Sequence, residues 1–268
     1  MTAAASADHV LSHFSLSRQH PIDDRIRLAA ANGFGGIGLF VGHYRQLELD
    51  GDAPGRLRKV LLEHHIELRE IEVVAGFGDG ATDAGERELV AHRMADEFGC
   101  RYLQVIGPAG PDIGAAGQAF GALCDRAGDH GLVVGLEFLP FTDVVDVHDA
   151  RRIVEHADRR NGGICVDIWH HERGARNLAA IAALPGELIT GIQINDGTRV
   201  PEHPDYYTDC LANRRAPGEG EFDVAGFLGA VRSTGTSAPL SFEVCSATGW
   251  TTPDDHIARI ARGARSIA

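Results

Sequence analysis

The sequence predicts a single (β/α)8 (TIM) barrel domain over residues 1–268, and three observations point to it. The length of 268 residues is typical of one such barrel. Short apolar runs alternate along the chain with longer helical patterns in eight successive units. Polar residues recur where the last four apolar runs end, and a barrel would bring those ends together. Alternation alone also suits a doubly wound sheet, but a count of eight favours the barrel.

The first four units each place a β-rich run before a helical run. Gly33 and Gly99 directly follow two of the helical runs, and glycine often ends a helix there because it tolerates a left-handed backbone. The predicted strand and helix of each unit are His9–Ser15 with Asp23–Asn32, Gly36–Val41 with Pro54–His65, Glu67–Val74 with Ala84–Phe98, and Arg101–Ile106 with Ile113–His130.

The last four units contain nearly continuous apolar strands such as LVVGLEFL and GICVDI, which are typical of parallel strands covered on both faces. The longest connection, Asp196–Glu221, follows the seventh strand at the end of a barrel where loops carry function. These units are Leu132–Leu139 with Val147–Arg160, Gly163–Asp167 with Ala175–Leu184, Leu188–Asn195 with Asp223–Ser233, and Leu240–Val244 with Pro253–Ile267.

Composition and charge exclude several classes of protein. The net charge of -13 argues against a nucleic-acid partner, which would require a basic face. The five cysteines are odd in number, widely spaced and without a CxxC pair, so neither a disulfide framework nor a zinc ribbon is expected, and a reducing cytoplasm is the simplest location. Residues 1–8 lack the pattern of a signal peptide, and no apolar stretch is long enough to cross a membrane.

Four polar residues lie at or near the carboxyl ends of strands five to eight. Glu137 lies in LEFLP, Asp167 ends CVDI, Gln193 lies in GIQIND and Glu243 lies in SFEVC. A carboxylate inside an apolar strand costs several kcal/mol unless it is paired or binds a metal. Each residue alone could simply be a satisfied polar group that closes the barrel end, but four in succession favour a shared site. Oxygen ligands suit Mg²⁺ or Mn²⁺, and a nearby imidazole would also admit Co²⁺ or Zn²⁺.

Further candidates surround this set. His170, three residues after Asp167, could orient the substrate, act as an acid or base, or support a metal ligand. A loop arginine could clamp a carboxylate or phosphate, although a solvated loop remains an equal alternative. Glu72 could equally be a paired strand-end acid, Trp169 could be an ordinary packing aromatic, and for His13 a structural or rim role is favoured over a role in the site. The predicted substrate-binding residues are Glu72, Arg214, Arg215, Trp169 and His13.

Taken together, these motifs resemble the xylose isomerase-like barrel family, also described as sugar phosphate isomerases and epimerases related to family 2 AP endonucleases. The resemblance extends from the second strand to the last helix. It implies that one divalent cation is held by Glu137, Asp167, Gln193 and Glu243, with the two glutamates also transferring protons. The motifs that carry it are Glu137 in LEF, Asp167-x-x-His170, Gln193 before Asn195-Asp196, PGEGEFD and Glu243.

The resemblance implies a divalent-metal-dependent isomerase or epimerase of a small keto sugar or keto-polyol, which acts through an enediolate and uses Mn²⁺, Mg²⁺ or Co²⁺, or else Zn²⁺. Gln193 departs from the histidine of many members and is similar to the 3-dehydroshikimate dehydratases of the same family. A lyase acting on 3-dehydroshikimate or an inosose is therefore the alternative. A barrel without catalysis and a nuclease are weaker interpretations. Barrels of this type often pair, so a homodimer is also open.

Overall fold

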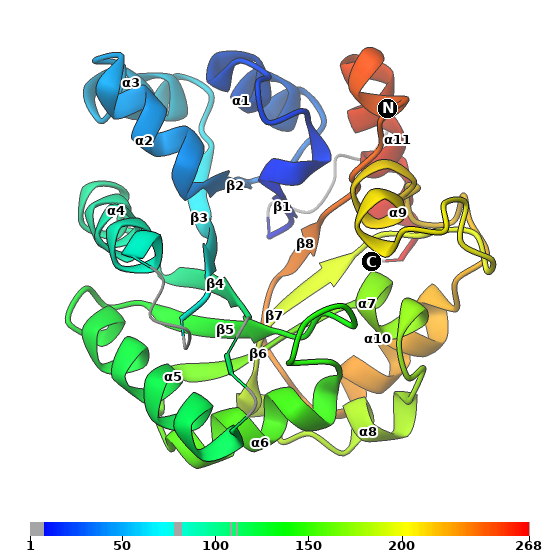
Figure 1. Ribbon diagram of the computed structural model, residues 1–268. Coiled ribbons are helices and arrows are strands. Elements are labelled where there is room, and N and C mark those ends of the chain that lie inside the picture. Colours follow the sequence, from blue (N-terminus) through cyan, green and yellow to red (C-terminus); the bar gives the residue numbers. More distant parts are fainter. Residues whose placement is uncertain (1–7, 78–81, 108, 111, 268) are drawn as a thin grey trace.

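The computed structural model describes residues 8–77, 82–107, 109–110 and 112–267. Eight parallel strands close into a barrel in the order β1 to β8, and helices surround it, which confirms the predicted (β/α)8 fold (Figure 1). The strands are β1 (Val10–Leu11), β2 (Gly36–Phe40), β3 (Glu67–Ala75), β4 (Tyr102–Ile106), β5 (Val133–Glu137), β6 (Gly162–Asp167), β7 (Ile189–Ile194) and β8 (Leu240–Phe242).

The helices pack outside the strands and bury their apolar faces against the barrel. The α-helices are α1 (Ile22–Ala31), α2 (Val41–Leu49), α3 (Gly55–Glu63), α4 (Thr82–Phe98), α5 (Ile113–Gly128), α6 (Val147–Ala157), α7 (Ile168–Arg173), α8 (Leu178–Ala182), α9 (Tyr206–Ala212), α10 (Val224–Ser233) and α11 (Pro253–Ser266). The described residues also form short 3₁₀ helices, η1 (His13–Ser15), η2 (Gly186–Leu188) and η3 (Gly249–Thr251).

Some element boundaries differ from the sequence prediction. The first strand ends early because the hydroxyl of Ser12 accepts a hydrogen bond from the Phe14 amide and starts η1. Helices α2, α7 and α9 were not predicted. The α7 helix begins where the Asp167 carboxylate accepts from the Trp169 amide, so the strand-end acid is also a helix cap.

The barrel interior below the mouth is filled by a tyrosine that spans it. The Tyr102 ring, from β4, lies over Gly135 of β5 and Gly191 of β7, where the Cβ of any larger residue would collide with the ring. Glu70 of β3 and Ser241 of β8 meet in the same interior, with a 2.6 Å hydrogen bond. The interior is therefore a packed floor, and a ligand can enter only the layer above it.

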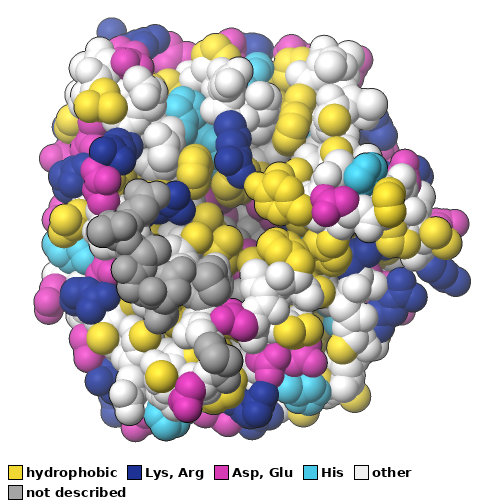
Figure 2. Space-filling view, in the orientation of Figure 1, with side chains coloured by type: hydrophobic (Ala, Val, Ile, Leu, Met, Phe, Trp, Pro, Cys, Tyr) yellow, Lys and Arg dark blue, Asp and Glu magenta, His cyan; other side chains and the backbone are white. Residues whose placement is uncertain are grey.

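The carboxyl ends of the strands open on the face seen in Figure 2, where hydrophobic side chains gather around a central hollow. Strand register places the candidate residues side by side at this end. Asp167 is opposite Gln193, and Gln193 is opposite Ser241. Glu137 is opposite Ile106 on one side and Cys165 on the other. Within the described part of the chain, no helix is long and apolar enough to cross a membrane.

Candidate active site

The four strand-end residues form one buried cluster at the barrel mouth. Glu137 ends β5, Asp167 ends β6, Gln193 is the penultimate residue of β7, and Glu243 directly follows β8. None of these side chains belongs to a residue more than 6% exposed. Three carboxyl groups and one amide are thus removed from water within a small volume, which is costly unless positive charge or protons compensate.

The amide of Gln193 can meet the two glutamates in either of two orientations. With Oε1 turned inward, that atom lies 3.0 Å from Glu137 Oε1 and 3.3 Å from Glu243 Oε2. With the amide reversed, Nε2 donates to both carboxylates over the same distances. Three oxygens this close repel one another unless a cation or proton lies between them. In one orientation the side chain donates hydrogen bonds to both carboxylates. In the other it presents its oxygen beside them, as a metal ligand would.

His170 extends the cluster on the side of β5 and β6. One ligand atom from each of Glu137, Asp167 and His170 lies within 4.8 Å of the other two. The His170 Nε2 atom is 3.2 Å from Glu137 Oε1 and 3.5 Å from Asp167 Oδ2. Its Nδ1 atom hydrogen bonds the Tyr206 hydroxyl at 2.8 Å. Tyr206, on the unpredicted helix α9, therefore fixes the orientation of the imidazole.

The Asp167 carboxylate is held from two sides. Its Oδ1 atom accepts from the Trp169 amide and from Asn195 Nδ2, both at 2.8 Å. Its Oδ2 atom accepts from Arg214 Nη1 at 2.7 Å. One oxygen is thus occupied by backbone and amide donors, while the other faces the cluster.

Arg214 is the buried cation of the site. Its Nη1 atom bridges Asp167 Oδ2 at 2.7 Å and Glu243 Oε2 at 2.9 Å, and its Nε atom donates to the Cys210 carbonyl at 3.0 Å. The residue is 3% exposed. Of the two arginines predicted in this loop, the structure brings Arg214 into the cluster.

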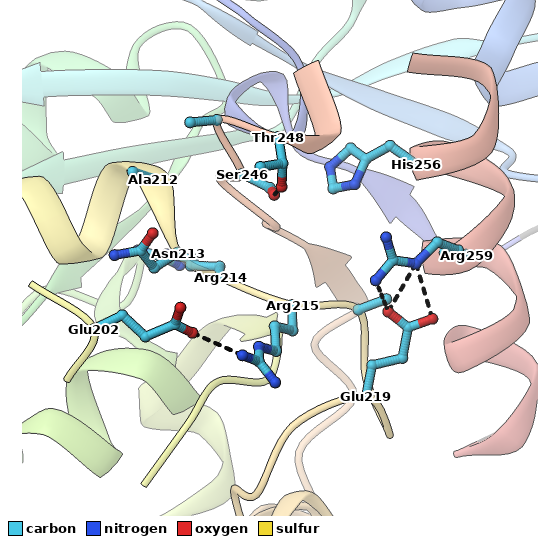
Figure 3. Close-up of a pocket in the computed structure, with 12 residues that line it drawn as sticks. Glu202, Ala212, Asn213, Arg214, Arg215, Glu219, Ser246, Thr248, His256 and Arg259 are labelled. Atoms are coloured by element: carbon cyan, nitrogen blue, oxygen red, sulfur yellow. Dashed lines mark hydrogen bonds and ion pairs between the residues drawn. The ribbon is translucent and has the colours of Figure 1, made fainter. Parts of the chain in front are cut away.

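Arg215 points the other way. Its Nη2 atom pairs with Glu202 at 2.8 Å in a second cavity of about 330 Å³, on the far side of the 213–216 segment. Figure 3 shows Arg215 directed towards Glu202 in this cavity, and Arg259 directed towards Glu219. Both of these arginines have carboxylate partners, so the second cavity contains no unpaired cation among its described lining residues.

Burial perturbs the acids that face the barrel axis. Desolvation raises the pKa of Glu243 to about 8, with Arg214 lowering it and Glu137 raising it. Desolvation also raises the pKa of Glu72 well above its usual range, and the nearby Glu70 and Glu243 add to the shift. Both effects disfavour the charged carboxylates, and a bound cation would oppose them. The grouped donors themselves, which are carboxylates, an amide oxygen and an imidazole, are of the kind that fits a divalent metal ion.

The other predicted substrate-binding residues lie farther from the open space. Glu72 is fully buried and accepts from the Ser12 hydroxyl at 2.9 Å and the His13 amide at 3.1 Å. Burial lowers the pKa of His13 well below its usual range, so its imidazole is neutral. Trp169 is fully buried, with its ring centroid 5.6 Å from that of Phe222 and Arg173 stacked on it. Their predicted contact with substrate stays a prediction.

A cavity of about 130 Å³ opens above the cluster. Its floor includes four of the polar residues already described and Gln104, which donates to Glu137 Oε2 at 2.7 Å. Sequence reasoning missed Gln104, although YLQVI places it in an apolar strand as GIQIND places Gln193. The walls are mainly apolar. The lining residues of the walls are Phe14, Arg18, Val73, Ile106, Leu139, Phe141, Tyr207, Cys210 and Leu211.

The loop that carries Arg214 is organised by the Asp196 carboxylate. This carboxylate accepts from four backbone amides, two at each oxygen, over 2.7–3.0 Å. A Cβ atom at Gly220 would collide with Asp196 and with the Gly197 backbone. The backbone amides of the PGEGEFD motif thus bind the Asp196 carboxylate rather than a ligand. The four donors are the amides of Gly197, Gly218, Gly220 and Phe222.

The chain is a closed parallel barrel whose carboxyl-end mouth holds a buried cluster of carboxylates, an amide and an imidazole that could bind a metal ion. The chain belongs to the xylose isomerase-like TIM barrel family, whose model matches residues 26–267. This confirms the resemblance found in the sequence motifs.

Similar proteins differ in their named reactions. A 3-dehydroshikimate dehydratase of Pseudomonas aeruginosa is 28% identical over 250 residues, which cover 86% of this chain and 37% of the dehydratase. The chain thus spans little more than a third of that relative. An inosose isomerase of Bacillus subtilis is 29% identical over 124 residues, covering 46% of this chain and 43% of the isomerase. The solved IOLI protein with a bound zinc atom superposes with a TM-score of 0.83 at 17% identity, covering 97% of both chains.

Proposed function

We propose that this protein is a divalent-metal-dependent dehydratase of a small cyclic keto-polyol, with 3-dehydroshikimate as the leading candidate substrate. The observation that carries the proposal is an oxygen-rich, buried floor beneath mainly apolar walls. Such a site can polarise a carbonyl at one end and enclose ring carbons at the other. Dehydration, which the sequence offered as the alternative, now has support equal to or greater than isomerisation.

Glu137, Asp167, Gln193 and Glu243 are the residues that would hold the cation, with His170 beside them. Hard oxygen ligands suit Mg²⁺, Mn²⁺ or Co²⁺. When bound, the cation would withdraw electrons from a substrate carbonyl and lower the cost of removing the neighbouring proton. Arg214 lies against two of these carboxylates and would face the same substrate oxygens.

The chain's own residues supply the proton transfers. A glutamate of the cluster, Glu137 or Glu243, takes the proton from the carbon next to the carbonyl. His170, oriented by Tyr206, gives a proton to the hydroxyl on the following carbon, which leaves as water. The ring then gains a double bond. In a 3-dehydroshikimate ring, loss of a further ring C–H proton and gain of a proton by the carbonyl oxygen, with no second loss of water, then yield an aromatic product. No oxidant or reductant is consumed.

The cavity walls favour a ring over an open-chain sugar. An open-chain ketose carries a hydroxyl on nearly every carbon, and each hydroxyl facing Val73, Ile106 or Leu139 would lose a hydrogen bond with water. A ring that becomes aromatic presents apolar carbons to those walls. The similarity to two curated dehydratases, which covers 86% of this chain in each case, supports the same choice.

Isomerisation remains the second candidate for a specific reason. The same proton abstraction, followed by return of the proton without loss of a hydroxyl, gives an isomer or epimer of a keto sugar. The shorter match to an inosose isomerase supports it.

The test is a product assay with two substrates. The purified protein, treated with a chelator and then loaded with Mn²⁺, Mg²⁺ or Co²⁺, would be given 3-dehydroshikimate or a keto-inositol. We expect an aromatic ultraviolet absorbance to grow from 3-dehydroshikimate. An isobaric product from the keto-inositol, with no reaction of 3-dehydroshikimate, would overturn the dehydratase and support the isomerase.

The metal requirement is tested by paired variants. Glu137→Gln combined with Asp167→Asn should abolish turnover and weaken metal binding by calorimetry, because two anionic ligands become neutral. The matched control is Glu155→Gln, an exposed acid of α6 paired only with Arg151. Unchanged metal affinity in the double variant would mean that the cluster is not the metal site.

A further inference from the structure

Arg18 stands at the rim of the mouth and lines the same cavity as the buried cluster. It follows η1 in the connection between β1 and α1. Its guanidinium carbon lies 5.3 Å from the Phe14 ring centroid and 5.4 Å from the Phe40 ring centroid. Two aromatic faces therefore restrict the position of an exposed side chain that would otherwise sample many rotamers.

Charge pairing distinguishes Arg18 from the other arginine of the cavity. Arg214 is committed to Asp167 and Glu243. Among the residues that the structure describes, no carboxylate forms an ion pair with Arg18, whereas most arginines on the outer helices do have acidic partners. Arg18 is thus a cation directed over a cavity and available to a ligand.

We propose that Arg18 binds a carboxylate of the substrate, so that the site takes a keto acid rather than a neutral polyol. This inference rests on the proposed function, because it uses the same cavity and the same placement of the substrate carbonyl at the cluster. The carboxylate lies outward under Arg18, and the carbonyl and its neighbouring hydroxyl lie inward.

The electrostatics of the cavity favour this orientation. Glu137 and Glu243 line the floor, and the floor arginine, Arg214, is already paired with Asp167 and Glu243, so a carboxylate that entered first would meet two acids and no unpaired guanidinium. The rim offers a guanidinium whose two parallel N–H donors match a carboxylate. A neutral polyol would gain little from an unpaired arginine at that position. The cavity therefore selects a molecule that carries a carboxylate at one end and a ketone with a neighbouring hydroxyl at the other.

The kinetic test compares Arg18→Gln with the parent on two substrates. With 3-dehydroshikimate, which carries a carboxylate, KM should rise roughly tenfold while kcat stays within about twofold, since the lost interaction is a charge-assisted contact outside the reacting atoms. With a neutral keto-inositol, KM should not change. The control is Arg152→Gln, an exposed arginine of α6 paired with Asp149. Equal changes for both substrates, or none for the acid, would overturn the proposal.

A binding experiment separates this proposal from the proposed reaction. Shikimate has the carboxylate but no ketone, so it probes the rim without turnover. Calorimetry on the metal-loaded protein should show that Arg18→Gln weakens shikimate binding roughly tenfold, about 1.4 kcal/mol. If the parent transforms neither substrate, the dehydratase proposal fails, but weaker shikimate binding by the variant would still support Arg18. Unchanged shikimate binding would overturn the role of Arg18 whatever the reaction.

Discussion

Gln193 is the neutral side chain of the cluster. Replacing its amide with another neutral group, such as an imidazole, would change the type of metal donor without changing the charge of the site. The amide oxygen is a hard, neutral donor, whereas an imidazole nitrogen is a stronger donor to borderline metals. The amide lies within 3.3 Å of both glutamates, so a cation bound between these three groups would contact it. The identity of this residue should therefore set metal preference more than it sets stability.

We expect Gln193→His to shift metal preference towards Zn²⁺ or Ni²⁺ by roughly tenfold, about 1.4 kcal/mol, relative to Mg²⁺ or Mn²⁺. The fold should persist, because the side chain lies at a strand end above the packed interior. Metal titrations of both proteins by calorimetry would measure the shift. Gln46→His, on the exposed surface of α2, is the control. An unchanged order of metal affinities would remove Gln193 from the set of ligands.

At this scale the sequence pointed to the acids that interrupt apolar strands, but it missed Gln104 of β4 and Tyr206 of α9. Glu137 and Asp167 stand out because a carboxylate interrupts an apolar run. Tyr206 leaves no such signal, since a tyrosine in a polar loop is ordinary and its contact with His170 depends on how the loop folds back. The different positions of Arg214 and Arg215 could not be predicted either. The two side chains point to opposite sides of one extended segment, and only the folded loop shows which of them faces the cluster.

At the scale of elements, the connection between β7 and α10 is an ordered structure built around one carboxylate. Asp196 accepts four backbone amides that come from both ends of the connection. The backbones of Asp196 and Arg215 also pair over 2.9 and 2.8 Å. This pairing fixes the backbone next to Arg214 and so holds the Arg214 side chain against the cluster. The conformation of the loop therefore affects the site through Arg214.

We expect Asp196→Asn to loosen this connection and lower kcat/KM at least tenfold while the barrel stays folded. An amide has one acceptor oxygen, so at least two backbone donors lose their partner, at a cost of about 1–3 kcal/mol each. Hydrogen exchange should rise within residues 197–222 and stay slow in the strands. Asp205→Asn, at the α9 cap that accepts from the Thr208 amide, is the matched control and should act weakly, because asparagine is also a good cap. Equal exchange in both variants would contradict this role.

The sequence did not predict two short helices that begin directly after a capping aspartate. The helices α7 and α9 begin directly after Asp167 and Asp205, whose carboxylates cap them. In the sequence, Asp167 reads as the end of a strand, and the helix of six residues that follows is too short to show a periodic pattern. The longer strands and helices were predictable because each strand has a continuous apolar run and each helix has an apolar pattern that extends over several turns.

At the scale of the whole molecule, the barrel buries more acid along its axis than its own cations neutralise. Glu70 lies in the interior, where it accepts a hydrogen bond from the Ser241 hydroxyl at 2.6 Å. Glu72 and Glu243 lie above it. Burial raises the pKa of Glu70 to about 7, and the hydrogen bond from Ser241 opposes the shift. The stability of the metal-free barrel should therefore depend on pH through these interior acids.

The sign follows from the two pKa values of Glu70. The folded protein holds a proton on this carboxyl up to about pH 7, whereas the unfolded chain releases it near the reference value of 4.5. Between these values the folded state binds more protons, so the free energy of unfolding falls as pH rises. The contribution is complete below about pH 4.5 and is lost above about pH 7. Its size is on the order of 3 kcal/mol.

Glu70→Gln should remove this part of the pH dependence, because the amide stays neutral and its oxygen still accepts from Ser241. Urea unfolding of chelator-treated parent and variant at several pH values would measure it. We expect nearly equal stabilities near pH 4.5, and a variant more stable than the parent by up to about 3 kcal/mol above pH 7. The charge of Glu70 also raises the pKa of Glu72 and Glu243, so the difference between the two proteins reports Glu70 together with its effect on these two acids. Glu155→Gln on exposed α6 should leave the pH profile unchanged. A difference that does not grow with pH would mean that Glu70 is charged in the folded barrel and neutralised by a group other than a proton.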